Sequence, residues 1–251
     1  DRIERCKKNY TELFGGEALT GQGTDPEMMD ILQNSSSGRY SAQEILKDPG
    51  AYHLHRISHD ANLAPTDAHA KAALNVGVTP IELREAIYLC APFIGFPKTL
   101  NALNTINEAF KQQGIALPLE RQATVTEEDR HEKGQAIQSR LYGEGIKEAM
   151  RNVPGNMGPE VERSSPNSAS ENLYSQRARP ENPGVTGLLH TKRPLKPKAN
   201  YTRISKGNLL AGNSKETLTA AVIQCLPYIG FPSAIKALKI IKESSQPPKE
   251  D

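Results

Sequence analysis

The chain has 251 residues, enough for two domains of ordinary size, and its 31 basic and 29 acidic side chains nearly balance, leaving a net charge of +2. This balance argues against a nucleic-acid-binding surface, which usually shows a clear basic excess, and no stretch approaches the roughly 18 uninterrupted apolar residues of a membrane span. The sequence shows neither a signal-like apolar run nor a Cys-x-x-Cys motif. Its three cysteines, Cys6, Cys90 and Cys225, are odd in number and widely spaced, which favours unpaired thiols in a reducing cytoplasm.

The start of the chain predicts two helices. Residues 1–13 place three apolar side chains among charged ones, as an amphipathic helix does, and a glycine pair follows at residues 15–16. A second helix is expected at residues 26–32, with Asp25 as its N-cap.

Three further helices are predicted between residues 68 and 110. Residues 68–77 form a short helix closed by Gly77, and Thr79 then caps the next one, with Glu82 at the capping-box spacing. Pro92 and the Gly-Phe-Pro run at 95–97 interrupt that helix, and an amphipathic helix follows. The apolar residues recur at the helical period and predict a core face: Leu83, Ala86, Ile87, Cys90, Leu100, Leu103, Ile106 and Phe110.

Much of the chain occurs twice. Residues 77–108 return as residues 212–243, a shift of 135 positions at which the cysteines, the Pro-x-Ile-Gly-Phe-Pro runs and the Ala-Leu pairs coincide. The beginning of the chain returns near residue 129, at a shift of 128. The sequence therefore predicts a first unit at 1–118, a linker at 119–128, and a second unit at 129–251 that is irregular between 160 and 203.

Both units lose their pattern in the same relative place. Residues 34–65 and about 163–203 are rich in proline, serine and other helix breakers, yet the register returns abruptly after each. Two hypotheses remain open: divergence into surface loops, or translation from a displaced reading frame. Comparing the encoding DNA in all three frames distinguishes them.

The repeated segments, GVTPIELREAIYLCAPFIGFPKTLNAL and GNSKETLTAAVIQCLPYIGFPSAIKAL, closely resemble the carboxymuconolactone decarboxylase family, which includes alkylhydroperoxidase D-like proteins. Two tandem copies are similar to its two-domain members. The resemblance implies an all-α fold of two tandem helical-bundle repeats and assembly into trimers or hexamers. It also implies decarboxylation of a small carboxylated lactone or related acid without cofactor or metal.

The family usually carries an Arg-Glu-Leu helix, a long aliphatic run and then Gln-Leu-x-x-His before this segment. His69 falls on that histidine, but Pro65 and Thr66 stand where Gln-Leu is usual, and the corresponding position in the second unit is Ile204. The peroxidase branch of the family also needs Cys-x-x-Cys, which is missing from this sequence.

Four residues are candidates for the chemistry. His69 suits a general base, since an ordinary histidine titrates near neutrality, but a helix-surface histidine is the alternative. Arg84 offers a cation to hold a carboxylate, or else lies on a solvated face. Cys90 and Cys225 are either reactive thiols or, as we favour, small buried hydrophobic residues late in apolar helices.

Two weaker patterns complete the survey. His53, His55 and His59 have a spacing that zinc can use, but in a window without regular structure. The basic stretch 177–198 has many prolines and few aromatic residues, which favours a solvated linker over a nucleic-acid arm.

We therefore predict a cytoplasmic, homo-oligomeric carboxymuconolactone decarboxylase-like protein that acts on a small molecule. The alternatives are a hydroperoxide-reducing thiol enzyme of the same fold and a non-catalytic oligomeric binding module.

Overall fold

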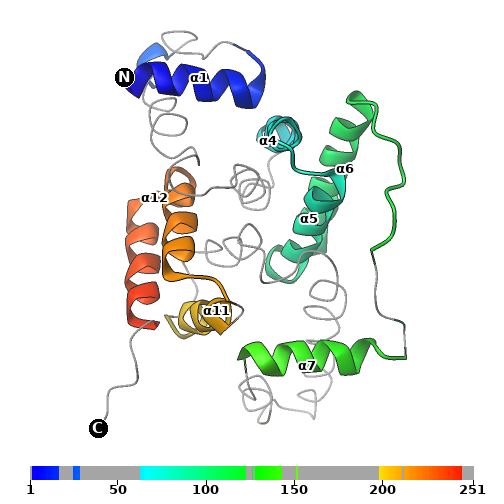
Figure 1. Cartoon of the computed structure of the whole chain (residues 1–251), viewed down its shortest axis with the longest axis vertical. Coiled ribbons are helices and arrows are strands. Elements are labelled where there is room, and N and C mark those ends of the chain that lie inside the picture. Colours follow the sequence, from blue (N-terminus) through cyan, green and yellow to red (C-terminus); the bar gives the residue numbers. More distant parts are fainter. Residues whose placement is uncertain are drawn as a thin grey trace.

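In the computed structural model of the chain, the structure describes residues 2–16, 25–28, 63–122, 126, 128–142, 151, 198–210 and 212–244. Within these ranges the regular structure is helical and contains no strand, so the predicted all-α class is confirmed there. The main helices are α1 (Arg2–Phe14), α4 (Leu63–Asn75), α5 (Pro80–Ile94), α6 (Phe96–Gln112), α7 (Arg130–Tyr142), α11 (Lys198–Leu210) and α12 (Lys215–Ser244) (Figure 1). No helix in this described part is long and apolar enough to cross a membrane.

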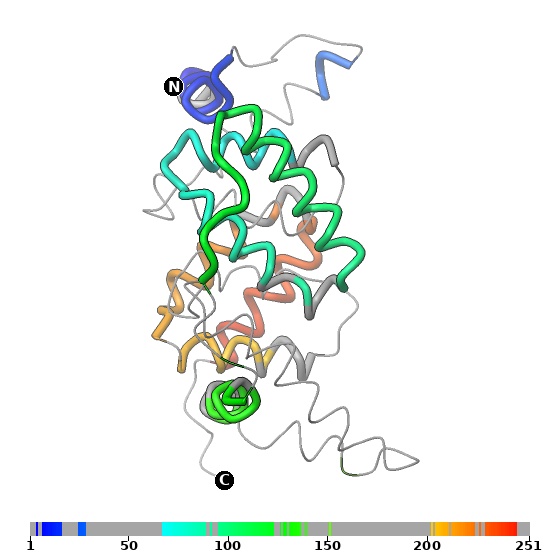
Figure 2. The backbone as a smooth tube through the Cα atoms, turned by 90° about the vertical axis from the view of Figure 1, so that its right-hand side faces the viewer, coloured from blue at the N-terminus to red at the C-terminus, as the bar shows by residue number. Residues whose placement is uncertain are grey.

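The helices form two groups by their contacts. In the first group α1 packs on α4, while α4 and α5 both pack on α6; in the second, α7 packs on α11 and α11 packs on α12. Figure 2 shows α1 and α7 near opposite ends of the molecule. The bounds of α1 and α7 differ by 128 positions, and those of α4 and α11 by 135.

Helix α5 begins where the sequence predicts. The Thr79 hydroxyl accepts a hydrogen bond from the Glu82 amide at 3.2 Å, and the Thr79 amide donates to Glu82 Oε2 at 2.9 Å. This reciprocal arrangement satisfies two amides that a helix start leaves without intrahelical partners, and it confirms the predicted capping box. Asp25 likewise accepts from the amide of Met28, as its predicted cap role requires.

Two predicted helix limits are wrong. α4 begins at Leu63 rather than near residue 68, because Pro65 stands in the first turn, where a missing amide hydrogen costs no helical bond. α5 continues past Pro92 and ends only at Gly95, whose φ of 83° is a backbone conformation that glycine adopts readily. Gly230 has nearly the same geometry, with a φ of 74°, and kinks α12 into two arms (Figure 1).

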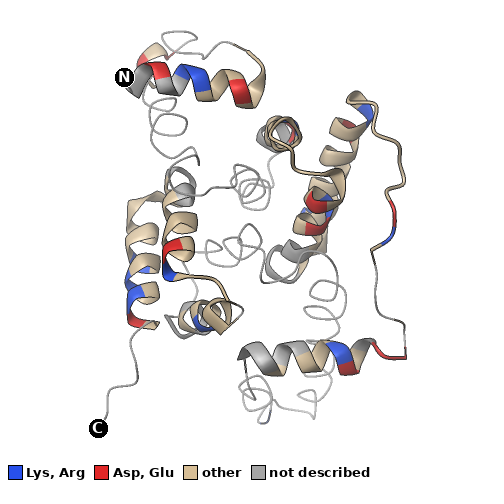
Figure 3. Cartoon of the chain, viewed as in Figure 1, with Lys and Arg blue, Asp and Glu red and all other residues tan. Residues whose placement is uncertain are grey.

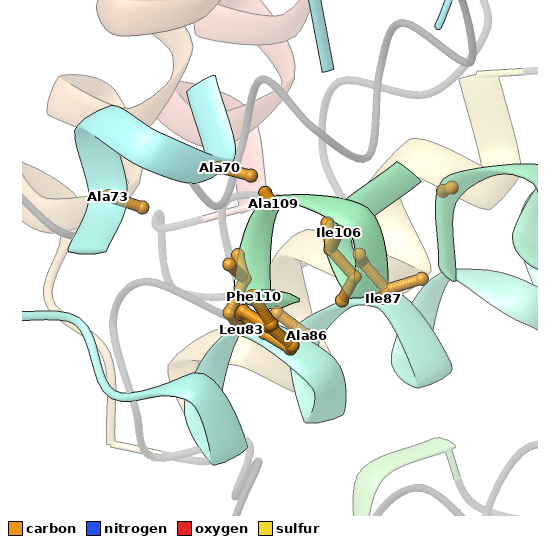
Figure 4. Packing of buried hydrophobic residues seen from close by; sticks show 9 residues of the cluster. Ala70, Ala73, Leu83, Ala86, Ile87, Ile106, Ala109 and Phe110 are labelled. Carbon is orange, nitrogen blue, oxygen red and sulfur yellow. The ribbon is translucent and has the colours of Figure 1, made fainter. Parts of the chain in front are cut away.

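The first group closes around Phe110, which is completely buried. Figure 4 shows Leu83 and Ala86 of α5 lying beside Phe110, with Ala70 and Ala73 reaching the cluster from α4. These alanines allow α4 to approach α6 closely. The predicted core positions on α5 and α6 are confirmed for Leu83, Ala86, Ile87, Ile106 and Phe110.

Leu100 does not join this core. The buried face of α6 consists of Thr99, Ala102, Ile106, Ala109 and Phe110, and Leu100 lies about 100° around the helix from Thr99. Its side chain is exposed, so its predicted place on the packed face is wrong. A second, smaller core joins the two arms of α12 through Leu218, Val222, Ala234, Ala237 and Ile241.

Replacing Phe110 with alanine should lower the free energy of unfolding by about 3–5 kcal/mol, because it leaves a cavity at the centre of the first core. Urea denaturation followed by circular dichroism measures the loss. Phe96→Ala is the matched control on the same helix, since the Phe96 ring is exposed, and it should change stability by less than about 0.5 kcal/mol. Equal losses in the two variants would contradict the assigned core.

Candidate functional site

His69 lies in α4 and is buried, with 4% of its surface exposed. Its ring meets the Phe14 ring of α1 edge-on, with centroids 5.7 Å apart and planes at 80°. Phe14 in turn packs against Tyr10, one turn earlier in α1, at 4.9 Å. The structure therefore places this histidine at an aromatic contact between two helices, and the alternative of a helix-surface histidine is wrong.

A hydrogen bond fixes α1 and α4 near this contact. The Asn75 side-chain amide donates to the carbonyl of Leu13 at 3.0 Å, across 62 positions of sequence. Leu13 is itself buried. The position of the Phe14 ring beside His69 thus depends on residues that are remote from His69 in sequence.

Arg84 and Glu85 form a second polar element, on α5. The Arg84 guanidinium donates to Glu85 Oε1 through Nε at 3.3 Å and through a terminal nitrogen at 3.1 Å. The two side chains are 12% and 2% exposed. A buried carboxylate is costly unless it is paired, and Arg84 supplies the pairing.

The same guanidinium fixes the segment that follows α6. It donates to the carbonyl oxygens of Leu119 at 3.2 Å and Glu120 at 2.7 Å, and it lies over the Tyr88 ring at 5.6 Å. Leu119 also packs against the first core. Because only 12% of the Arg84 side chain is exposed, the alternative of a solvated Arg84 is wrong.

Burial raises the pKa of Glu85 above the ordinary glutamate value, and the hydrogen bond and charge of Arg84 only partly oppose this rise. Sequence reasoning missed Glu85 as a site residue, since a charged residue between Leu83 and Ala86 resembles one on a solvated helix face. The signal that the sequence did offer was the position of Glu85 directly before two predicted core residues, Ala86 and Ile87. In the structure all three residues are buried.

The polar residues of α4 and α5 form two separate elements. His69 contacts Phe14 of α1, whereas Arg84 and Glu85 pair with each other and hold the segment that follows α6. Their sequence neighbours Ala70 and Ala86 belong to the same core around Phe110.

Residues 57–108 match the model of the Carboxymuconolactone decarboxylase family. The match covers about a fifth of the chain and includes α4, α5 and most of α6, with His69, Arg84 and Glu85 within it. It supports the family resemblance over these residues. No curated protein sequence matches the chain.

The other candidates are placed less completely. Cys90 lies in α5, within the carboxymuconolactone decarboxylase match, and Cys225 lies in α12, but the surroundings of both side chains fall outside the described structure. His53, His55 and His59 also lie outside it, as do the irregular residues 34–62 and 163–197. Among the residues that are described, no group of three metal-binding side chains occurs.

Glu85→Gln should change how stability depends on pH. The folded state holds the proton of Glu85 more tightly than the unfolded chain does, so the wild type loses stability as pH rises from about 4.3, the ordinary glutamate value, through the higher folded pKa. The glutamine variant lacks this loss. Its free energy of unfolding relative to wild type should therefore increase between about pH 4 and pH 8.

Glu108→Gln controls for the change in net charge, because it removes an exposed carboxylate from the neighbouring helix. Urea denaturation at several pH values makes the comparison. A Glu85→Gln difference that is constant with pH would contradict the raised pKa.

Arg84→Gln should release the segment that follows α6. Arg121 directly follows Leu119 and Glu120, whose carbonyl oxygens Arg84 binds, and it is exposed. Loss of a hydrogen bond to a charged group costs about 1.5 kcal/mol. Trypsin should therefore cut after Arg121 at least about tenfold faster in the variant. Mass spectrometry of a limited digest measures the rate. Lys111→Gln, which removes only an exposed ion pair with Glu108, should leave the rate unchanged.

Proposed function

We propose that the chain is a carboxymuconolactone decarboxylase-like enzyme that removes carbon dioxide from a small carboxylated lactone or a related acid. The observation that carries the proposal is the buried His69, which lies inside the family match and against the aromatic ring of Phe14. The proposal takes this imidazole as the acid–base group because histidine is the side chain used most often for proton transfer in catalysis.

The reaction requires a base and then an acid at one place. In the proposed step, neutral His69 takes the proton of the substrate's carboxylic acid. The bond between the ring carbon and the carboxyl carbon then breaks, its electron pair enters the conjugated lactone, and carbon dioxide leaves. The protonated imidazole returns the proton to carbon, so the histidine ends the cycle as it began.

Arg84 has a different proposed role. A decarboxylase needs a group that holds the substrate carboxylate, and Arg84 is the nearest cation in sequence to the apolar core of α5. Its guanidinium already serves Glu85 and the carbonyls of Leu119 and Glu120. We assign Arg84 to positioning Glu85 and the end of the first unit; its direct contact with substrate remains a prediction.

We further propose that the two helix groups are copies of one unit. The shared shifts of helix bounds and the similar glycine geometry at Gly95 and Gly230 support this. The second copy has Ile204, Thr219 and Ala220 at the positions of His69, Arg84 and Glu85. The chemistry is therefore assigned to the first unit, and the second unit has a structural role.

The test is turnover of a carboxymuconolactone by the full chain, followed by the loss of substrate absorbance or by release of carbon dioxide. His69→Ala should lower kcat by about 100- to 10,000-fold, the usual contribution of general acid–base catalysis. The control is His131→Ala, which changes an exposed histidine of α7, outside the family match. It should leave kcat unchanged.

Two results would contradict the proposal. Wild-type protein that is folded and inactive on carboxylated lactones supports a non-catalytic binding module. Full activity in His69→Ala removes the assigned base. Consumption of hydroperoxide with loss of free thiols, measured on the same samples, would instead support the thiol-enzyme alternative.

A further inference from the structure

The second arm of α12, which follows the kink at Gly230, carries a row of exposed side chains. Four residues of one face are exposed: Phe231, Ile235, Lys239 and Lys242. At about 100° per residue they lie within about 80° of one another around the helix, and at about 1.5 Å per residue they span about 17 Å along it. We call these four residues the outer row. Lys236 is exposed beside it.

The outer row lies away from the core of its own helix group. The arm contributes Ala234, Ala237 and Ile241 to that core. These three residues are about 100–160° around the helix from the middle of the row. Phe231 and Ile235 are each 60% exposed, so the packing of the second group leaves both in water. Neighbouring exposed apolar side chains are a feature of interaction sites.

The first group repeats the apolar part of the row. At the shift of 135 positions, Phe231 corresponds to Phe96 and Ile235 to Leu100. Phe96 and Leu100 are 68% and 56% exposed. Both groups therefore leave the same two apolar positions uncovered, and their surfaces differ in the charges that follow.

Three lysines of the second arm stand where α6 has three asparagines. The corresponding pairs are Lys236 and Asn101, Lys239 and Asn104, and Lys242 and Asn107. Since α6 forms and packs with asparagine at these places, the helix does not require lysine there. Figure 3 shows the basic residues of the second arm in blue, in its half farther from the kink. The basic charge thus belongs to the surface of the second group and not to the helix geometry.

The lysines of α6 are placed differently. Lys98 lies about 200° around the helix from Phe96, and Lys111 forms an ion pair with Glu108 at 2.6 Å. None of the ion pairs among the described residues involves the three lysines of the second arm. The outer row therefore joins exposed apolar side chains to cations that have no carboxylate partner in this part of the chain.

The helix dipole explains one of these lysines. The C-terminal end of a helix favours a cation within its last turn, and Lys242 lies in the last turn of α12. Lys239 and Lys236 lie about one and two turns earlier, where this effect has decayed. Their charge therefore points to a partner outside the helix.

We propose that the outer row binds an acidic amphipathic helix of a different protein. Its residues are spaced by four, four and three positions, which is the spacing of side chains on the contact face of packed helices. The first half of the row is apolar and the second half is basic. An antiparallel partner helix therefore places aliphatic side chains against Phe231 and Ile235 and carboxylates against Lys239 and Lys242.

The distribution of the side chains favours a protein over a membrane surface. A helix that lies on a membrane presents apolar side chains along its length, whereas those of the outer row are confined to the half nearer the kink. Basic clusters that bind anionic lipids usually hold about four to eight cations, and the second arm has three lysines. A short helix with both characters matches the row better.

Fluorescence anisotropy of a labelled synthetic peptide tests the proposal on the full chain. The helical peptide has about 18 residues, with glutamates at its third and sixth positions and leucines at its tenth and fourteenth, which matches the spacing of the outer row in the antiparallel direction. A second peptide has lysines in place of the glutamates. Wild type should bind the acidic peptide at least about tenfold more tightly than the basic one, because like charges oppose binding.

Two variants remove the two halves of the row. Lys236→Asn, Lys239→Asn and Lys242→Asn together give this arm the residues of α6, and they should weaken binding of the acidic peptide about tenfold through the loss of three exposed ion pairs. Phe231→Ala should weaken it about 30-fold, because a buried aromatic residue dominates such contacts. Lys111→Asn removes a lysine outside the row and should bind as wild type does.

The reciprocal exchange should create a second site. Asn101→Lys, Asn104→Lys and Asn107→Lys together place the three lysines beside the exposed apolar pair of α6, so the number of acidic peptides bound per chain should rise from one to two. Circular dichroism checks that each variant folds.

Three results would overturn the proposal. The first is equal binding of the two peptides, or unchanged binding in the triple asparagine variant. The second is binding to vesicles with about 30% phosphatidylserine that is tighter than binding to the peptide, which indicates a membrane surface. The third is a change of oligomeric state in the triple asparagine variant, which indicates that another copy of the chain covers the row. Peptide binding is measured without substrate, so it does not depend on the proposed decarboxylase activity.

Discussion

The reversal of the chain at Gly95 determines how the first group of helices packs. A residue with φ near 83° turns the backbone sharply, so α6 folds back along α5 and brings Phe110 beside Leu83 and Ala86. A residue with a Cβ atom is strained at this φ even where space is free. Gly230 makes the same reversal in α12, and the smaller core there depends on it in the same way.

The reversal also decides which side chains stay outside. Once Thr99 and Ala102 face α4 and α5, Phe96 and Leu100 are turned away from the core by the geometry of the helix. The exposure of Phe96 and Leu100 therefore follows from the same turn that creates the interior. In the second group, Phe231 and Ile235 are in the same position relative to Gly230.

The polar part of the site depends on contacts that are distant in sequence. Glu85 can remain buried because Arg84 pairs with it, and Arg84 is held in turn by carbonyl oxygens 35 and 36 positions later. His69 depends on α1, through Phe14 and through the bond between Asn75 and Leu13. Removing Arg84 would leave Glu85 without its pairing, so the effects of changing these two residues on stability should not add independently.

Local patterns predicted much of the fold. Thr79 and Glu82 specify the start of α5 through bonds between near neighbours, and the helical period of Leu83, Ile87, Ile106 and Phe110 specifies its core. The site was less accessible to such reasoning. The burial of Glu85, the three partners of Arg84 and the aromatic contact of His69 depend on how segments 35 to 55 positions apart come together, and no short pattern encodes that.

The chain segment between α1 and α4 differs in length from its counterpart between α7 and α11. The connection between these helices has 48 residues, and the one between α7 and α11 has 55. The difference of seven residues equals the change in shift from 128, between α1 and α7, to 135, between α4 and α11. The turns at Gly95 and Gly230 keep the shift of 135, so the change in length between the two groups lies before α4 and α11 and leaves the helices that pack around each turn in register.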